Sequence, residues 1–409
     1  NSLAIKDRAP YLGESKHMAQ PGAGFYVFGI KDALDTDNEW FYDKKTKELF
    51  VYRSDNEIPT ENYFYKSRVN AFDFSRAKYV TIQDITILGA SIKTSINTSN
   101  LILDRVKVLY PYYRSQNNKM YPKLNTKGFV LNGKNSIVKN SELAYSSGAC
   151  IVLNGQNNKL LNSYIHDGNL IGDIMGNVVL EGKGNVISHC TITRSGRTLI
   201  RYSQMYQALI QNCELSYSGL LSSDLGLTYG TNIEGGNSEV RYNLMHDNLS
   251  EDKEKSMGLY YDHGTKNIIS HHNIIWGVDQ AGLLINHYAA NHLVYNNTFI
   301  SKKYGFKSSW GQEYFLPGME LVSGRNRLIN EIGIVTSYPL MERVAERLDW
   351  DVSYYKLGNI KTTELYPISP FNIELVSGEQ NYAMFFVYFP SATTFQISDD
   401  PETIKDAKV

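Results

Sequence analysis

The segment "GLYYDHGTKNIISHHNIIW", residues 258 to 276, concentrates side chains that could do chemistry: Asp262, His263, His271 and His272. Imidazole and carboxylate groups can ligate a metal ion, exchange protons in acid/base catalysis, or simply hold turns in place. Zinc would need three or four converging ligands, and His271 and His272, adjacent on an extended chain, point to opposite faces. The choice among these roles depends on the elements that position the residues.

Composition excludes some classes of partner. The chain has 409 residues and a formal net charge of −1, so no global basic field draws in nucleic acid or an anionic membrane. The longest apolar run, "AMFFVYF" from Ala383, is much shorter than a membrane span. We expect neither nucleic acid nor a membrane as a partner. The chain begins at Asn1 without a signal-like segment, so we expect a mature or trimmed product.

Cysteine and tyrosine usage is informative. Cys150, Cys190 and Cys213 form no CxxC motif and are expected to be small buried apolar residues rather than a disulfide framework. Thirty tyrosines, together with abundant asparagine, suit long β surfaces that stack on sugar rings.

A repeat organises the middle of the chain. Lines such as "VKNSEL", "ISHCTI", "IQNCEL" and "ISHHNI" recur roughly 22 to 30 residues apart. A second strand recurs between them, as in "GFVLNG", "CIVLNG", "GLTYGT" and "GLYYDHG". This pattern predicts an all-β fold, a parallel β-helix whose coils stack at about 4.8 Å. Propeller and leucine-rich repeats do not fit the spacing.

Three parts are expected along the chain. Residues 1–75 would form a flanking N-terminal β segment that covers the first coil, and residues 76–335 the β-helix. Residues 336–409 would form a C-terminal cap or small β module. In that last part "PLMERVAERLDW" has an amphipathic helical pattern, and "NYAMFFVYFPSATTFQIS" is typical of strands.

At this point the chain resembles the right-handed parallel β-helix carbohydrate-active enzymes, mainly the glycoside hydrolases, which are related in fold to pectate-lyase-like polysaccharide lyases. Three stretches carry the resemblance. The first is "EWFYDKKTKELFVY", which resembles the two-strand ribbon with a polar turn that precedes the helix in these hydrolases. The others are "SSDLGLTYGTN", and "MGLYYDHGTKNIISHHNIIW" with the following "LVYNNTF". The similarity covers about residues 25 to 305 and is clearer for the fold than for one activity. It implies a secreted, periplasmic or cell-surface bacterial protein.

The resemblance also implies two catalytic carboxylates. Matched by position, these are Asp224 in "SDLG" and Asp262 in "YYDHG". Leu225 and His263 depart from the commoner "SDCGAIY" and "YLDDG" patterns, which puts the sugar and the linkage in doubt. Glycoside hydrolysis needs one carboxylic acid and one nucleophile or base. On fully extended strands the two acids lie too far apart. Either Gly226 or Gly230 bends the chain and brings them together, or another acid, first Glu234 and then Glu181, is the partner of Asp262.

Aligning the second strands predicts which residues neighbour Asp262. Leu259 and Tyr261 should face the core, and Tyr260 and Asp262 should face outward. The predicted outward column is Asn132, Asn154, Glu181, Tyr202, Gly230, Asp262 and Asn286. A cleft along this face would suit an extended glycan.

Further residues are candidates for substrate binding. Arg201 could clamp a carboxylate or sulfate, or could instead pair with Glu181. The other candidates are Tyr202, Tyr229, Tyr260, His263, His287 and Trp310. His272 falls in an inward ladder with Cys190, Cys213 and Asn243, so it and His271 are expected to be scaffold. No cofactor is required by the pattern, and Ca²⁺ is a possibility without a clear acidic cluster.

Three functions remain open at this stage. The first is a glycoside hydrolase that uses two carboxylates. The second is a polysaccharide lyase, in which Arg201, a histidine or a tyrosine removes a proton beside a uronate carboxylate. The third is a β-helix that binds glycans without catalysis.

Overall fold

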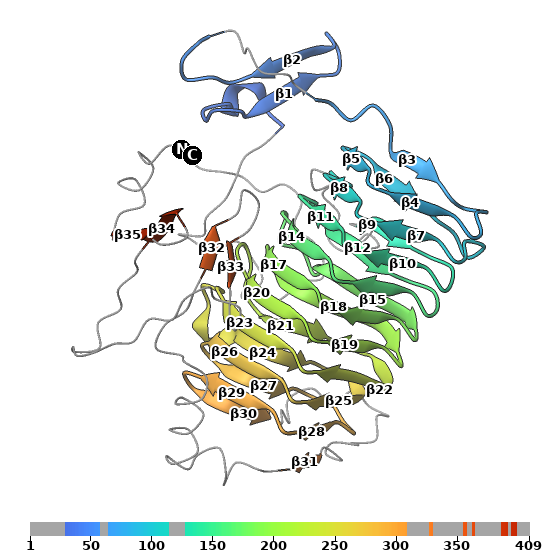
Figure 1. Ribbon diagram of the computed structural model, residues 1–409, viewed down its shortest axis with the longest axis vertical. Helices are drawn as coiled ribbons and strands as arrows, with labels where there is room; N and C mark the ends of the chain where they lie inside the picture. The colour runs from blue at the N-terminus through green and yellow to red at the C-terminus, as the bar shows by residue number, and fades with distance from the viewer. Residues whose placement is uncertain are drawn as a thin grey trace, which may run out of the picture. The chain divides into compact units, whose positions relative to one another are not determined.

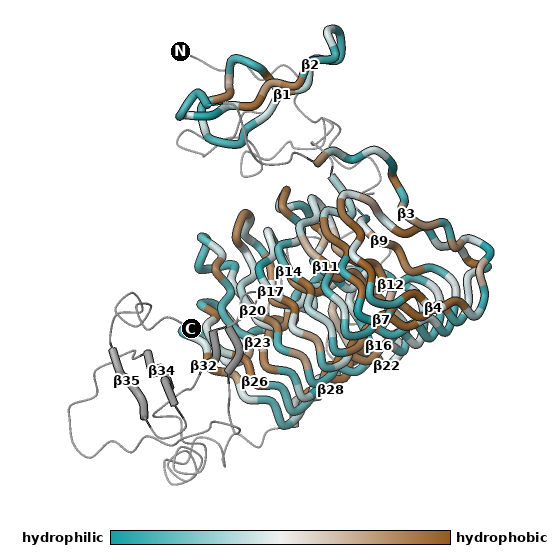
Figure 2. The backbone as a smooth tube through the Cα atoms, turned by 45° about the horizontal axis from the view of Figure 1, so that its top comes forward, coloured by the Kyte–Doolittle hydropathy of each residue, from teal (hydrophilic) through white to brown (hydrophobic). Residues whose placement is uncertain are grey.

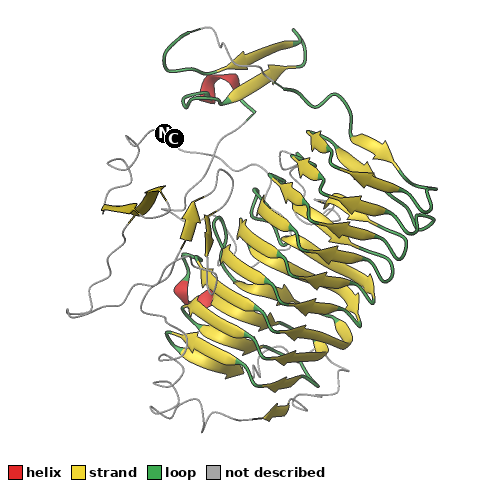
Figure 3. Ribbon diagram, viewed as in Figure 1, coloured by secondary structure: helices red, strands yellow, loops and turns green. Residues whose placement is uncertain are grey.

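The structure is a computed structural model, which describes residues 29–57, 64–113 and 127–308 and five later strands. The chain divides into two compact units, Asn1–Glu331 and Ile332–Val409. Strands dominate the described residues (Figure 3), with short 3-10 helices at η2 (Lys31–Ala33) and η3 (Lys253–Lys255). No helix within this described part is long and apolar enough to cross a membrane.

The first unit contains a right-handed parallel β-helix built from three long sheets, as the repeat predicted (Figure 1). One of them, the eight-stranded sheet, consists of β9 (Lys127–Leu131), β12 (Ala149–Leu153), β15 (Gly176–Lys183), β18 (Thr198–Tyr206), β21 (Leu225–Gly230), β24 (Ser256–Tyr261), β27 (Ala281–Ile285) and β30 (Tyr304–Ser308).

The other two sheets complete each coil. The nine-stranded sheet consists of β5 (Thr86–Leu88), β8 (Lys107–Leu109), β11 (Glu142–Ala144), β14 (Tyr164–Gly168), β17 (Thr191–Ser195), β20 (Glu214–Ser218), β23 (Leu244–Asn248), β26 (Ile274–Val278) and β29 (Thr298–Ser301). The ten-stranded sheet consists of β4 (Thr81–Gln83), β7 (Ile102–Asp104), β10 (Ile137–Lys139), β13 (Lys159–Leu161), β16 (Val186–Ser188), β19 (Leu209–Gln211), β22 (Glu234–Arg241), β25 (Lys266–His271), β28 (Leu293–Tyr295) and β31 (Arg327–Ile329).

Four strand pairs lie outside these sheets. The predicted ribbon "EWFYDKKTKELFVY" is confirmed as the antiparallel pair β1 (Trp40–Asp43) and β2 (Glu48–Val51), and β3 (Asn70–Asp73) pairs with β6 (Ser91–Lys93). The second unit holds two antiparallel pairs: β32 (Tyr355–Leu357) with β33 (Thr362–Glu364), and β34 (Phe386–Ser391) with β35 (Thr394–Ser398). The strands expected in "NYAMFFVYFPSATTFQIS" are therefore present, while the expected helix in "PLMERVAERLDW" lies outside the described residues.

The core lies inside the coils, where one apolar residue per strand stacks on its equivalent in the next coil. Hydrophobic segments accordingly recur at equivalent places in successive coils (Figure 2). The inward column of the eight-stranded sheet contains Leu131, Leu153, Leu180, Tyr202, Tyr261 and Ile285, all of them buried. The three cysteines are buried and free, as predicted.

A left-handed residue connects the ten-stranded sheet to the nine-stranded sheet in each coil. It is often asparagine, as at Asn140 and Asn212, because a short amide tolerates a positive φ. In later coils the next residue is polar, points inward and satisfies the backbone of the preceding coil. Asn243 accepts from the Cys213 N–H at 3.0 Å, and Asn273 accepts from the Asn243 N–H at 3.1 Å.

Candidate active site

Asp262 lies immediately after β24 on the outer face of the eight-stranded sheet. The Tyr229 hydroxyl donates to one carboxylate oxygen at 2.7 Å, and the Asn286 side-chain amide donates to the other at 2.7 Å. Asn286 follows β27, one coil further on, and also lies 3.3 Å from the Tyr260 hydroxyl. Both oxygens of this half-buried carboxylate are therefore oriented by neighbouring coils.

Two arginines pack against the ring of Tyr229. The Arg201 guanidinium lies 4.4 Å from the ring centroid and the Arg197 guanidinium 5.4 Å from it. Such cation–π contacts favour a positive charge on the ring face. Arg201 is only 9% exposed, and its Nη1 atom has no hydrogen-bond partner among the described residues. A buried guanidinium N–H without an acceptor is costly, so this group is suited to a ligand that brings an acceptor.

Asp224 lies one coil before Asp262, at the turn that enters β21. Its backbone has a φ of 60°, its side chain is exposed, and its carbonyl oxygen accepts from Arg197 at 2.8 Å. The negative charges of Asp262 and Asp224 both act on the Tyr260 hydroxyl. Tyr260 thus links the two acids that the resemblance singled out.

Burial dominates the electrostatics of the cluster. It raises the pKa of Tyr229 well above the usual range, and the Asp262 charge adds to this, so Tyr229 remains a proton donor. Burial also raises the pKa of Tyr260. Burial lowers the pKa of Arg201, while the neighbouring Tyr229 opposes this shift. The face holds two neutral hydroxyls and one desolvated cation beside a carboxylate.

The structure corrects the predicted column at Tyr202 and Gly230. Tyr202 pairs with Leu180 and with Gly230, and Gly230 pairs with Tyr261, so these residues belong to the inward column. Tyr202 is fully buried in the core and is not available to bind substrate. A side chain at Gly230 would meet the Tyr202 ring 2.9 Å away, so the glycine makes room for it. The orientations predicted for Leu259, Tyr260 and Tyr261 are confirmed.

The two alternative acids are engaged elsewhere. Glu181 accepts from Lys127 Nζ on both oxygens, at 2.8 and 2.9 Å, so it pairs with Lys127 rather than with Arg201. Glu234 begins β22 in the ten-stranded sheet, where its carboxylate accepts from Asn267 at 2.6 Å and from the Gly236 N–H at 3.0 Å. These contacts tie both acids to the scaffold.

The candidates His263 and His287 lie in the turns beyond the strands. His263 directly follows Asp262 and makes an edge contact with Tyr288, with ring centroids 5.0 Å apart. The His287 carbonyl accepts from the Gly264 N–H at 3.1 Å, which places these two histidine turns on adjacent coils. Trp310 lies outside the described residues.

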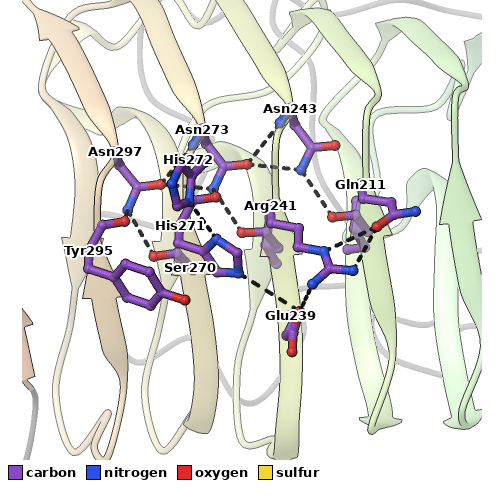
Figure 4. Close-up of polar contacts among 12 residues, drawn as sticks. Gln211, Glu239, Arg241, Asn243, Ser270, His271, His272, Asn273, Tyr295 and Asn297 are labelled. Atoms are coloured by element: carbon purple, nitrogen blue, oxygen red, sulfur yellow. Dashed lines mark hydrogen bonds and ion pairs between the residues drawn. The ribbon is translucent and has the colours of Figure 1, made fainter.

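His271 and His272 lie on the ten-stranded sheet (Figure 4). His271 faces outward and stacks on Tyr295 at 4.7 Å, while its Nδ1 lies 2.8 Å from Nδ1 of His272. The prediction that His272 points inward is wrong, because Asn273 occupies the inward position of that ladder. The displacement arises from a core pair: Ser270 takes an inward position and hydrogen-bonds the Tyr261 hydroxyl.

Metal coordination finds no support at the histidines. Within residues 29–57, 64–113 and 127–308, no three His, Cys, Asp or Glu side chains gather in a way that could hold a metal ion. Two residues near Asp262, Asn286 and Arg197, were not among the candidates that the sequence suggested. Asn286 was already aligned with Asp262, and Arg197 directly precedes β18, the strand that carries Arg201.

Comparison with known proteins supports the architecture. A family model described as "Right handed beta helix region" matches residues 127–299. No curated protein and no solved structure matches the chain. The β-helix is a scaffold that carries many enzymes and binding proteins, so the activity must be argued from the site itself.

Proposed function

We propose that this chain is a glycoside hydrolase that cleaves a polysaccharide or oligosaccharide at the Asp262 site. The observation that carries the proposal is the double hydrogen bonding of the Asp262 carboxylate by Tyr229 and Asn286, beside a second acid, Asp224, whose charge acts on the same Tyr260 hydroxyl. Two carboxylates on one face are what glycoside hydrolysis requires.

The surroundings suggest distinct roles for the two acids. Asp262 is held on both oxygens, as suits a nucleophile or a base that must aim at a sugar carbon or a water molecule. Asp224 is exposed at a turn and can reach the leaving oxygen as the general acid. Tyr229 and Tyr260 are 6% and 5% exposed, so they act on the acids through their hydroxyls and do not form the stacking surface that the sequence suggested. No metal or cofactor is needed for this chemistry.

The test is the release of reducing ends from polygalacturonate, alginate, xylan and dextran. Asp262→Asn should lower the rate about 1,000-fold, or ~4 kcal/mol in barrier, because the amide cannot act as nucleophile or base. Glu239→Gln, a matched change on the ten-stranded sheet, should stay within about twofold of the unmodified protein. Undiminished activity in Asp262→Asn would sink the proposal.

Asp224→Asn tests the second role. A loss of about 100-fold supports Asp224 as the general acid. A rate close to that of the unmodified protein overturns that assignment and directs the search to another acid near Asp262.

A polysaccharide lyase is the second candidate, and Arg201 is the observation that favours it. Its Nη1 lacks a partner among the described residues, so it could hold a uronate carboxylate, and burial lowers its pKa, which is the direction that a base needs. A lyase would release an unsaturated product that absorbs in the ultraviolet, whereas a hydrolase would not. Tight oligosaccharide binding without any turnover would instead indicate a binding protein.

A further inference from the structure

Two of the three cysteines occupy the same place in successive coils. Cys190 directly precedes β17 and Cys213 directly precedes β20, and each follows a left-handed residue, His189 or Asn212. The pairing of β16 with β19 and of β17 with β20 matches residues that are 23 positions apart, which is also the separation of the two cysteines. They therefore stack on each other where the ten-stranded sheet passes into the nine-stranded sheet (Figure 1).

The two thiols point inward and touch each other. Each cysteine is only 2% exposed and belongs to the core. Each thiol donates to the carbonyl oxygen two residues earlier, at 3.4 Å from Cys190 to Ser188 and at 3.1 Å from Cys213 to Gln211, so both have the same orientation. The Cys190 N–H also donates to the Cys213 Sγ at 3.4 Å, and a hydrogen bond joins the two sulfurs.

The coil spacing matches the span of a disulfide. Neighbouring strands lie about 4.8 Å apart, and disulfides bridge Cα atoms that are roughly 4.4–6.8 Å apart. The hydrogen bond from Cys213 lowers the pKa of Cys190 in spite of burial, whereas burial raises the pKa of Cys213. Cys190 is therefore the thiol that ionises first, and the thiolate is the form that attacks a disulfide.

Cys150 provides an internal contrast. It lies in β12, where the strand register stacks it on Gly128 and Asn177 and not on another thiol. Its side chain is fully buried, its Sγ lies 3.7 Å from the His166 carbonyl oxygen, and burial raises its pKa to about 12. Cys150 is thus a cysteine of the same chain without the arrangement of the other two.

We propose that Cys190 and Cys213 are a modification site, at which a disulfide donor such as oxidised glutathione converts the two thiols into a cross-link between coils. The Cys190 thiolate attacks one donor sulfur, which forms a mixed disulfide and releases one donor thiolate. Cys213 then loses its proton and attacks the Cys190 Sγ, which releases the second donor thiolate. Two electrons pass from the cysteines to the donor, and the two protons end on the two donor thiols.

The cross-link joins two coils of the candidate site. From Cys190 the chain continues through β17 to Arg201, and from Cys213 it continues through β20 to Tyr229. A covalent bond between these coils stabilises the fold because it restricts the unfolded chain. Because both thiols are buried, we expect the donor to react while the coils form. This inference does not depend on the proposed hydrolase function.

The experiment refolds the full chain with oxidised glutathione, blocks free thiols after denaturation and digests the protein with trypsin. We expect one free thiol per chain, that of Cys150, and one linked peptide pair made of residues 184–194 and 202–241. Three free thiols, glutathione adducts without an internal link, or a link that contains Cys150 would each overturn the proposal.

Thermal unfolding connects the link to stability. The oxidised protein should unfold about 5 °C above the reduced protein. Cys190→Ser and Cys213→Ser should each abolish this difference, and both should fold, because Ser141 and Ser163 already fill this place in earlier coils and accept a backbone N–H there. Cys150→Ser is the matched control and should retain the full difference. A difference that persists in folded Cys213→Ser would contradict the assignment.

Discussion

The outer faces of the eight-stranded and ten-stranded sheets carry similar residue types but differ in how their polar groups are satisfied. On the ten-stranded sheet, Arg241 donates two bonds to Gln211 and one to Glu239, and His271 stacks on Tyr295 (Figure 4). On the eight-stranded sheet, Arg201 is buried over Tyr229 with Nη1 unpartnered among the described residues.

This difference distinguishes the structural network on the ten-stranded sheet from the candidate site on the eight-stranded sheet. When every donor in a network has an acceptor, the network stabilises the stacked coils. Few hydrogen-bonding groups then remain for a ligand. A buried donor without an acceptor reduces stability, and proteins tolerate such cost mainly where function needs it. The histidine-rich segment that is most conspicuous in the sequence belongs to the first kind, and Arg201, which packs on the Tyr229 ring beside Asp262, belongs to the second.

The largest expected effect on stability concerns His292, which directly precedes β28 of the ten-stranded sheet and stacks on Tyr261, the last residue of β24, at 4.6 Å. Burial lowers its pKa from 6.5 to about 4, so the folded state prefers the neutral ring. The associated stability is fully present above pH 6.5 and is lost as the pH falls towards 4, up to about 3 kcal/mol. Urea unfolding between pH 4 and 8 should show this loss, and His292→Gln should flatten it.

His246 is a control for His292, because its pKa is shifted in the opposite direction. Its pKa is raised to about 9 by Asp247 and Glu214, against the effect of burial. Its contribution is present below pH 6.5 and is lost as the pH rises through 9. His246→Gln should therefore leave the acid slope unchanged, and an altered acid slope in this variant would contradict the assignment to His292.

The next effect compares the two arginines. Arg201→Met should lower activity about 30-fold, or ~2 kcal/mol, with stability unchanged or slightly increased, because a desolvated charge is removed. Arg241→Met should lower stability by about 1 kcal/mol through lost hydrogen bonds and leave activity unchanged. Thermal unfolding and initial rates measured on both variants check this, and equal losses of activity would erase the distinction between the two faces.

The smallest effect comes from single hydroxyls. Tyr229→Phe removes the bond to Asp262 and should lower the rate about fivefold, or ~1 kcal/mol, with a displaced pH–rate profile. Tyr295→Phe keeps the stacking on His271 and should change neither rate nor profile. A Tyr229→Phe profile that superimposes on that of the unmodified protein would show that the hydroxyl does not tune Asp262.

Much of the fold was predictable because a β-helix repeats its apolar positions coil by coil. The outward orientation of Asp262 followed from local alternation, and the ribbon before the helix followed from the resemblance. The site was only partly predictable. Tyr202 was misplaced and the partners of Glu181 were missed, because these depend on alignment between coils rather than within a strand.

The sequence by itself determined the parallel β-helix, the inward and outward faces of β24 and the presence of acids at Asp224 and Asp262. Tertiary structure alone decided which residues stand side by side, since a slip of one residue turns a strand's side chains to the opposite face. That register is set by packing inside the coils: Gly230 yields space to Tyr202, and Ser270 meets the Tyr261 hydroxyl. The neighbours of Asp262 therefore follow from core volume and core hydrogen bonding, which single strands do not reveal.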